Sequence, residues 1–488
     1  MTKRNAAVVG GGVIGAGWAA RFLLMGWDVA VADLDPEAPR KVGEVLANAR
    51  RSLPGLHDVA LPPEGRLTVT ADLAAAVAGA EWVQESVPET LALKHRIIAE
   101  IQRHAPEALI GSSTSGFKPS ELQEGAADPS RILVAHPFNP VYLLPLVELV
   151  PSPANPAHVV EGAKAVLTGI GMYPLHVRKE IDAHIADRFL ESVWREALWL
   201  VKDGIATTEE IDDAIRYGFG LRWAQMGLFE TYRVAGGEQG MRHFIAQFGP
   251  CLSWPWTHLT DVPDLTDELI DAIAAQSDAQ SGAYSIRELE RIRDANLVGI
   301  MRSLKGYSAD AKAGWGAGLL LRAQDARFGK PEPDLSGPIL TVDRAVPLDW
   351  TDYNGHMNEA RYLQAFGDAT DRFMEIVGCD ADYIATGGSY FTAETHIRHL
   401  GEVSAGDRIE VRTQLLGGEG KKMHLFHEMR VGGEVRATGE HLLLHVSLET
   451  RRASPPGEAV AKRMAEVWAA HKDLPPPDGA GRAVGQGR

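Results

Sequence analysis

The stretch Val8-Val9-Gly10-Gly11-Gly12-Val13-Ile14-Gly15 decides how the first part of this chain folds. Its glycines have the spacing G-x-G-x-x-G, and they stand between a short apolar run (Ala6–Val9) and a helical stretch (Trp18–Met25). A strand, a glycine turn and a helix in this order place backbone N–H groups of the helix N-terminus against a pyrophosphate. The stretch therefore predicts a dinucleotide site. The residues predicted to line it are Gly10, Gly11, Gly12, Val13, Ile14 and Gly15.

The next strand identifies the dinucleotide. It covers Val29–Ala32 and leads into Asp33, 18 residues after Gly15. A carboxylate at this point accepts hydrogen bonds from the adenosine ribose hydroxyls and repels a 2′-phosphate, so NAD is expected rather than NADP. A glycine-rich turn without a ligand is the alternative for an isolated motif. Strand, helix and acidic residue in the right order favour dinucleotide binding.

The composition is that of a multidomain globular protein. With 488 residues, about three domains are expected at roughly 150 residues each. A hydrophobic fraction of 45% and a charged fraction of 23% exclude a wholly disordered or fibrous chain. No transmembrane run or signal peptide is expected, and only two cysteines, Cys251 and Cys379, fit a reducing cytoplasm. The net charge of −16 disfavours nucleic acids and anionic membranes as partners.

Hydrophobic patterning predicts where the domains lie. In residues 1–182, short apolar runs alternate with helical stretches, which predicts βαβ units and a parallel sheet. Residues 183–328 have helical periodicity without a convincing strand and predict an all-helical domain. Residues 329–338 hold three prolines and two glycines, which predicts a linker. In residues 339–450 one helix is followed by strand-like runs, which predicts a small α+β domain, and residues 451–488 are expected to form a helix and a disordered tail.

A histidine and a glutamate in the first domain could perform acid–base chemistry. His136 follows the apolar strand Ile132–Ala135, and ligands of parallel sheets bind at the carboxyl ends of the strands. Glu148 lies twelve residues later within an apolar strand, where a carboxylate is unfavourable unless it is paired. A His–Glu pair would let the imidazole take a hydroxyl proton while hydride leaves for NAD. A structural histidine bonded to the backbone is the alternative.

Together these motifs resemble the L-3-hydroxyacyl-CoA dehydrogenases over residues 1 to about 300. The matching motifs are the glycine stretch, Asp33, Ser-Ser-Thr-Ser at 112–115, His-Pro-Phe-Asn-Pro at 136–140 and Glu148. The resemblance implies that His136 is the general base, that Glu148 is its partner and that Ser115 contacts the substrate hydroxyl. The residues that it places against the cofactor or the active site are Glu89, Lys94 and Asn139.

One position departs from the family pattern. Where the family begins its first long helix with a sequence like Asn-Arg-Leu, this chain has Asp187-Arg188-Phe189. A carboxylate near the substrate needs a cationic partner, which Arg188 or a cationic substrate could supply. Aromatic residues of the helical domain could hold a quaternary ammonium group through cation–π contacts of about 0.5–2 kcal/mol each, although packing in the core or at a dimer contact is the alternative. They are Trp194, Trp199, Tyr217, Phe219, Trp223, Phe229, Tyr232, Trp254 and Trp256.

Within the broader family the sequence looks like the L-carnitine dehydrogenases, which oxidise L-carnitine, a trimethylammonium hydroxy acid, to 3-dehydrocarnitine. The substrate carboxylate would need a cation, for which Lys118, Arg188 and Arg222 remain candidates. The alternative substrates are a 3-hydroxyacyl-CoA and a sugar acid such as gulonate.

The C-terminal domain contains a second candidate site at residues 349–358 (DWTDYNGHMN). A helix N-terminus after this turn could polarise a thioester carbonyl, and Asp352 could activate water or attack directly, whereas a helix cap without chemistry is the alternative. With Tyr362 and Leu363 the stretch resembles the hot-dog thioesterases of the 4-hydroxybenzoyl-CoA thioesterase type. That resemblance implies Asp352 as the first catalytic candidate and Glu394 as the second. No metal site is expected, because the nearby histidines lack a ligand cluster.

The two resemblances also imply a reason for the fusion. Some carnitine dehydrogenases carry a C-terminal thioesterase that hydrolyses betainyl-CoA to glycine betaine and CoA, so both domains would handle a trimethylammonium group. Helical and hot-dog domains both imply a homodimer. A hot-dog domain that only dimerises or binds a ligand is the alternative.

Overall fold

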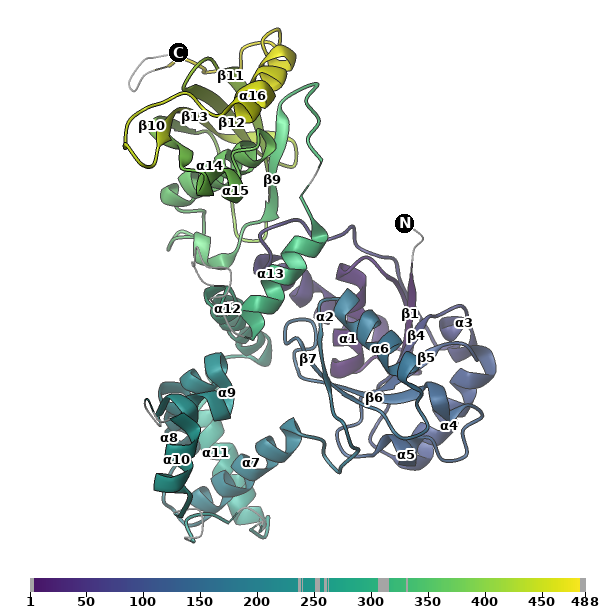
Figure 1. Cartoon of the computed structure of the whole chain (residues 1–488). Coiled ribbons are helices and arrows are strands. Elements are labelled where there is room, and N and C mark those ends of the chain that lie inside the picture. The colour runs from purple at the N-terminus through teal and green to yellow at the C-terminus, as the bar shows by residue number, and fades with distance from the viewer. Residues whose placement is uncertain are drawn as a thin grey trace. The chain divides into compact units, whose positions relative to one another are not determined.

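The structure is a computed structural model, shown in Figure 1. It describes residues 4–235, 238, 240–250, 255–258, 261, 263–305, 316–330 and 332–482. Predictions made above for Cys251, Trp254 and residues 331 and 483–488 lie outside these residues. The chain divides into two compact units, residues 1–50 with 62–323 and residues 51–61 with 324–488. Each unit has its own hydrophobic core.

The first unit contains an eight-stranded sheet in the order β3-β2-β1-β4-β5-β6-β7-β8. Its strands are β1 (Asn5–Val9), β2 (Asp28–Ala32), β3 (Leu67–Thr70), β4 (Trp82–Glu85), β5 (Leu109–Ser112), β6 (Ile132–Pro137), β7 (Leu146–Val150) and β8 (Tyr173–His176). The first six strands are parallel to their neighbours, as predicted, but β7 is antiparallel to β6. The all-parallel prediction was wrong at β7 because residues 138–145 are too few for a parallel crossover, which takes a dozen or more.

Helices cover both faces of this sheet. They are α1 (Val13–Leu24), α2 (Ala38–Ser52), α3 (Leu73–Val77), α4 (Leu91–His104), α5 (Pro119–Leu122) and α6 (Ala157–Gly169). Apolar side chains of α3, α4 and α5 pack in one core with the central strands, and α1 lies on the opposite face (Figure 1). The arrangement is the Rossmann fold, and it places the carboxyl ends of β1, β4, β5 and β6 along one edge.

The rest of the first unit is helical, as predicted. Its helices are α7 (Ala186–Lys202), α8 (Thr208–Ala214), α9 (Gly220–Ala235), α10 (Gly240–Phe248), α11 (Asp267–Ser281), α12 (Ile286–Ser303) and α13 (Ala317–Phe328), the last of which continues into the second unit. Helices α8, α11 and α12 begin where the hydroxyls of Thr207, Thr266 and Ser285 accept a hydrogen bond from a backbone N–H group. None of the helices that the structure describes has the length and apolar composition needed to cross a bilayer.

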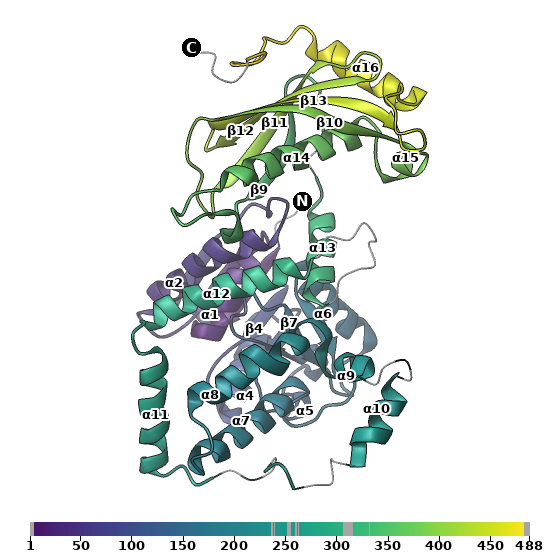
Figure 2. The same ribbon diagram turned by 90° about the vertical axis from the view of Figure 1, so that its left-hand side faces the viewer.

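The second unit has the predicted α+β composition. Its antiparallel sheet has the order β10-β13-β12-β11-β9. The elements are β9 (Ile339–Ala345), α14 (Glu359–Ile376), α15 (Ala381–Ala385), β10 (Gly388–His399), β11 (Arg408–Gly417), β12 (Lys422–Val431), β13 (Glu434–Ser447) and α16 (Glu458–His471). Figure 2 shows α14 lying along one face of this sheet, where Phe366 and Phe373 are completely buried. One long helix wrapped by an antiparallel sheet is the hot-dog arrangement.

The segment after α16 differs from the sequence prediction. A disordered tail was expected after the helix in residues 451–488, but residues 475–481 contact the sheet. Gln414 donates to the Pro475 carbonyl at 3.3 Å, Arg398 donates to the Asp478 carbonyl at 3.3 Å, and Gly481 N donates to Glu440 at 2.7 Å. Side chains from strands distant in the sequence hold this segment, so its own composition could not predict that it is ordered.

Candidate active sites

The loop between β1 and α1 has a shape that requires glycine. Gly10 has a φ of +99°, and a Cβ there would lie 2.5 Å from the Ser86 carbonyl oxygen. A Cβ at Gly15 would lie 1.8 Å from the Gly10 carbonyl oxygen. At Gly12, by contrast, a Cβ would meet nothing within 4 Å, so the space before the α1 N-terminus is open. Asp33, at the end of β2, accepts a hydrogen bond from Gly11 N at 2.5 Å and so stands beside that space.

His136 and Glu148 face each other across two neighbouring strands. They are direct partners in the antiparallel ladder of β6 and β7, and His136 Nδ1 lies 3.1 Å from Glu148 Oε2. The Glu148 side chain is completely buried, and that of His136 is 7% exposed. A carboxylate at Nδ1 makes that nitrogen the N–H donor and leaves Nε2 as the acceptor. The pairing predicted from the sequence is therefore present.

The second carboxylate oxygen of Glu148 fixes the start of α7. Its Oε1 accepts hydrogen bonds from Ile185 N at 2.8 Å and Ala186 N at 2.9 Å. Ala183 and His184 approach this cap with φ angles of 57° and 51°, a left-handed backbone that is strained for residues with a Cβ. Burial raises the pKa of Glu148, but the hydrogen bonds from His136 and the two backbone N–H groups outweigh it, and the pKa lies below its ordinary value.

Two side chains approach His136 Nε2 from different elements. Ser115, in the loop after β5, has its Oγ 3.2 Å away, and Asp187, in the first turn of α7, has its Oδ2 3.7 Å away. Arg188 does not neutralise Asp187 in this arrangement, because its Nε donates to the Asp182 carbonyl oxygen instead. Burial raises the pKa of Asp187, and the neighbouring His136 opposes that rise. The site therefore holds a carboxylate that is partly desolvated and faces the imidazole.

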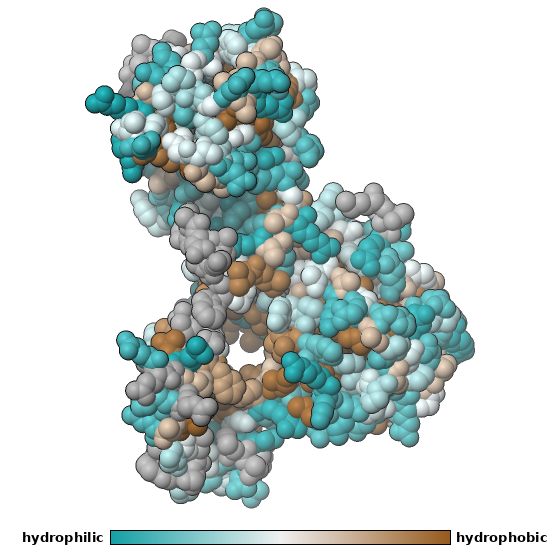
Figure 3. All heavy atoms as spheres, viewed as in Figure 1, coloured by the Kyte–Doolittle hydropathy of each residue, from teal (hydrophilic) through white to brown (hydrophobic). Residues whose placement is uncertain are grey.

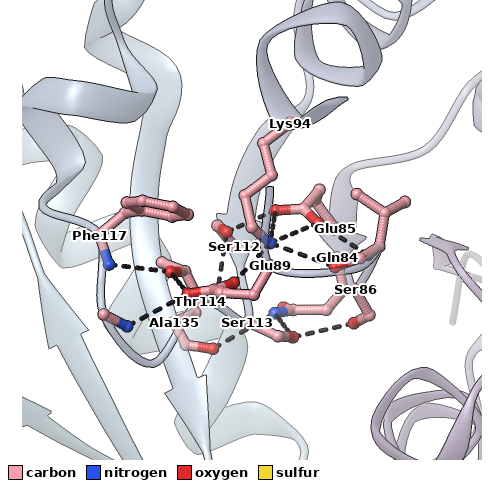
Figure 4. Close-up of polar contacts among 12 residues, drawn as sticks. Gln84, Glu85, Ser86, Glu89, Lys94, Ser112, Ser113, Thr114, Phe117 and Ala135 are labelled. Carbon is pink, nitrogen blue, oxygen red and sulfur yellow. Dashed lines mark hydrogen bonds and ion pairs between the residues drawn. The ribbon is translucent and has the colours of Figure 1, made fainter. Parts of the chain in front are cut away.

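Glu89 and Lys94 belong to a polar cluster beside this site (Figure 4). Lys94 is 1% exposed and lies between Glu85 and Glu89, with Nζ–oxygen distances of 3.0 and 3.2 Å. Glu89 accepts hydrogen bonds from the Thr114 hydroxyl and from Gly116 N, and so ties the β4–α4 loop to the loop that carries Ser115. The structure thus places Glu89 and Lys94 where they hold the Ser115 loop in position.

The aromatic ring that contacts His136 is one that the sequence analysis did not single out. Phe138 lies edge-on to the imidazole with ring centroids 4.9 Å apart. Several of the aromatic residues proposed from the helical domain pack on one another or on polar neighbours instead. Trp199 stacks on His258 with Lys202 over its ring, and Phe219 packs on Trp223. Asn139, expected near the cofactor, is exposed and follows Phe138 at the end of β6.

The second unit holds Asp352 in a tight turn before α14. Asp352 Oδ1 accepts a hydrogen bond from Asn354 N at 2.8 Å, and Asp352 N donates to the His356 carbonyl oxygen at 2.9 Å. Asn358 caps α14 by accepting from Ala360 N, as the sequence suggested for the helix start. The turn therefore holds the Asp352 carboxylate a few residues from the N-terminus of an 18-residue helix.

Glu394 does not join Asp352 within this chain. Its neighbour Thr395 contacts His441, which packs against Phe366 of α14, so Glu394 points to the opposite face of the sheet. There it lines a groove of about 640 Å³ with His396, His424, Glu440 and Trp468. His427, by contrast, is completely buried between the hydroxyls of Thr370 and Thr413.

Family models match both units. The NAD binding domain of 3-hydroxyacyl-CoA dehydrogenase matches residues 5–181, and the C-terminal domain of the same enzyme class matches residues 184–285. The thioesterase-like superfamily matches residues 346–464. The order of these matches is the order in which the sequence motifs suggested the two families.

Relatives with both parts share most of this sequence. A protein of Ruegeria pomeroyi named L-carnitine dehydrogenase/betainyl-CoA thioesterase is 67% identical over 98% of this chain and 99% of its own length. A protein of the same name from Agrobacterium fabrum is 57% identical over 98% of this chain and 97% of its own length. The chain belongs to the L-carnitine dehydrogenase/betainyl-CoA thioesterase family.

The first unit of this family member also resembles a solved structure. It is that of 5-formyl-3-hydroxy-2-methylpyridine 4-carboxylic acid 5-dehydrogenase, described as an NAD+-dependent dismutase. The two share 25% identity with a TM-score of 0.54, over 63% of this chain and 100% of that chain. NAD is the cofactor of the first unit, and the residues fit it: Gly12 leaves room before α1, and Asp33 stands where a ribose would lie.

Some residues that shape the first site of this family member were missed by the sequence analysis. His184 is completely buried, and its ring lies 5.6 Å from that of His136. Burial and the neighbouring His136 lower the pKa of His184. Leu34 is 86% exposed directly after Asp33. The exposure of a large apolar side chain beside the Asp33 carboxylate can be seen only in the structure and could not be predicted from the sequence.

Proposed function

We propose that the chain is a bifunctional enzyme. Its first unit oxidises L-carnitine to 3-dehydrocarnitine with NAD, and its second unit hydrolyses betainyl-CoA to glycine betaine and CoA. The observation that carries the redox assignment is the placement of His136 within hydrogen-bonding distance of both Ser115 and Glu148. Ser115 follows β5, His136 lies at the carboxyl end of β6, and Glu148 lies in the middle of β7.

In the dehydrogenase reaction His136 acts as general base. Glu148 holds the Nδ1–H, so Nε2 accepts the proton of the substrate hydroxyl, which Ser115 orients. When bound, NAD would supply the hydride acceptor for the carbon that bears the hydroxyl, so the alcohol becomes a ketone, and NADH and one proton are the other products. The resulting imidazolium lies between Glu148 and Asp187, and both carboxylates stabilise it.

Asp187 distinguishes a trimethylammonium substrate from an acyl-CoA. The carboxylate is 19% exposed beside His136 Nε2, where it would face a cation carried near the reacting carbon. The Phe138 ring beside His136 adds an apolar surface suited to the methyl groups. For the substrate carboxylate, Lys118, Arg188 and Arg222 remain the candidates; Lys118 pairs with Asp182 at 2.7 Å, and Arg188 donates to the Asp182 carbonyl oxygen. A 3-hydroxyacyl-CoA or gulonate carries no cation near its reacting carbon that could face Asp187.

For the hydrolase reaction we propose Asp352 as the group that activates water or attacks the thioester. The turn fixes its carboxylate through Asn354 N, and the α14 N-terminus supplies N–H groups toward a developing oxyanion. The carbon–sulfur bond breaks, CoA leaves as the thiol, and water supplies the oxygen of the free acid. A hot-dog domain that only pairs or binds a ligand is the alternative.

We also propose that two copies of the chain pair in a reducing cytoplasm. Helix α7 exposes Phe189, Leu190, Val193 and Trp194, and the side chains four residues apart lie on one face. Figure 3 shows hydrophobic residues at the surface of the helical part. A second copy is the occupant that would remove such a face from water. Sedimentation of the purified chain as a monomer would overturn this assembly.

One panel of assays tests both activities. The purified chain is mixed with NAD and either L-carnitine, 3-hydroxybutyryl-CoA or gulonate, and NADH formation is followed. Betainyl-CoA is then supplied without NAD, and free thiol is measured. NADH from carnitine and thiol from betainyl-CoA are expected. NADH from 3-hydroxybutyryl-CoA but not from carnitine would overturn the redox assignment, and absence of thiol release would favour the non-catalytic hot-dog domain.

A further inference from the structure

A short segment from the middle of the NAD-binding sequence folds with the second unit. Residues 51–61 group with residues 324–488, although the chain on both sides of them belongs to the first unit. The 3-10 turn η1 (Leu53–Leu56) contacts β9, and its Leu53 and Leu56 are 0% and 1% exposed. The contacts of η1 with β9 therefore place this buried segment with the second unit.

Two polar contacts follow directly after η1. His57, whose side chain is completely buried, has its Nδ1 2.7 Å from Asp325 Oδ1. Asp58 forms an ion pair with Arg344 of β9 at 2.7 Å, and the Arg344 side chain is 4% exposed. The Asp58 side chain is 43% exposed, so it reaches the buried guanidinium from the surface, and the ion pair orients Arg344 at a half-buried position.

Arg344 in turn contacts the base of the Asp352 turn. Its guanidinium lies over the Trp350 ring, 4.6 Å from the centroid, and Trp350 is 4% exposed. The Trp350 carbonyl oxygen accepts a hydrogen bond from Asn358 N at 2.9 Å. These two residues therefore close the turn, and Asp352 lies between them in the sequence. Contacts therefore run without a break from Asp58 through Arg344 and Trp350 to the turn.

We propose that Asp58, a residue within the dehydrogenase sequence, is a positioning residue for the Asp352 turn, acting through the Arg344 guanidinium and the Trp350 ring. The inference rests on the proposed thioesterase function of that turn. It implies that hydrolysis by the second unit depends on a segment that the first unit's sequence supplies.

The test compares three variants of the full chain. Asp58→Ala should lower kcat for betainyl-CoA hydrolysis on the order of 10-fold with KM unchanged, because the reacting carboxylate loses its fixed geometry. Asp58→Glu should retain most of the rate. Glu64→Ala removes a nearby carboxylate that pairs with Arg50 instead, so it serves as the matched control and should behave like wild type. Carnitine oxidation should stay unchanged in all three, and an unchanged KM for betainyl-CoA shows that the second unit of each variant is folded.

A second readout does not depend on the substrate. Amide hydrogen exchange at Asp352 and Asn358, whose N–H groups close the turn, should be faster in Asp58→Ala than in Glu64→Ala. Arg344→Lys should increase the exchange rate equally, because a lysine keeps the charge but loses the planar stacking on Trp350. In the double variant Asp58→Ala/Arg344→Lys the exchange rate should be no higher than in either single variant. Unchanged exchange in Asp58→Ala overturns the inference, whereas failure of wild type to hydrolyse betainyl-CoA overturns the proposed function alone.

Discussion

Glu148 lies directly opposite His136 in the β6–β7 ladder, and one carboxylate oxygen faces the imidazole while the other caps α7. A single side chain thereby sets both the imidazole tautomer and the start of the helix that carries Asp187. Changes at Glu148 should therefore alter catalysis and local stability together, which few other residues of the site can do.

Replacing Glu148 by glutamine should reduce kcat for carnitine oxidation on the order of 100-fold, because an amide does not stabilise the imidazolium that forms when His136 takes the proton. Steady-state NADH formation measures the loss. Betainyl-CoA hydrolysis by the same preparation is the internal control and should be unchanged. A wild-type kcat in this variant would show that the pairing has no catalytic role.

The same substitution should change how stability depends on pH. The folded-state pKa of Glu148 is lowered, so this carboxyl contributes stability that is full above its unfolded pKa of about 4.3 and is lost as pH falls through the folded pKa. The gap in Tm between wild type and Glu148→Gln should therefore shrink below about pH 4.3. Thermal unfolding of both proteins across that range measures it, and a gap that stays constant on acidification would refute the linkage.

Asp187→Asn should raise KM for carnitine on the order of 10-fold, because the amide no longer attracts the trimethylammonium group. KM for NAD should not move. Glu191→Gln is the matched control, since Glu191 lies on the same helix and pairs with Arg195 at 3.6 Å. Equal KM values in wild type and Asp187→Asn would remove Asp187 from substrate recognition.

Asp33→Ser should weaken the preference for NAD over NADP on the order of 10-fold, because the repulsion of a 2′-phosphate disappears. The variant also loses the hydrogen bond from Gly11 N, so KM for NAD should rise as well. The ratio of kcat/KM for the two dinucleotides is the measurement. An unchanged ratio would mean that Asp33 stabilises the glycine loop but does not discriminate between the ribose of NAD and that of NADP.

Local patterns predicted much of this molecule. The structures of the glycine stretch, the strand before His136 and the turn at Asp352 are determined by residues adjacent in the sequence. The two families that these motifs resemble were confirmed. The His136–Glu148 pair was predicted from the unfavourable burial of a lone carboxylate, although the antiparallel register that creates it was not.

Features that depend on distant partners could not be predicted. The sequence around Asp187 does not show whether its carboxylate faces Arg188 or His136. In the fold it faces His136, because Arg188 donates to the Asp182 carbonyl oxygen instead. The alternating pattern around Glu394 predicts a strand, but which face of the sheet Glu394 lies on depends on where α14 packs. Residues 51–61 lie within the range 1–182 predicted as one βαβ domain, and their grouping with the second unit depends on contacts with β9.

The most direct test of the account measures both activities in His136→Ala and in Asp352→Ala. The account predicts that His136→Ala loses carnitine-dependent NADH formation by on the order of 1,000-fold and keeps betainyl-CoA hydrolysis, and that Asp352→Ala shows the reverse. Carnitine oxidation at the wild-type rate by His136→Ala would contradict the assignment of this imidazole as the base.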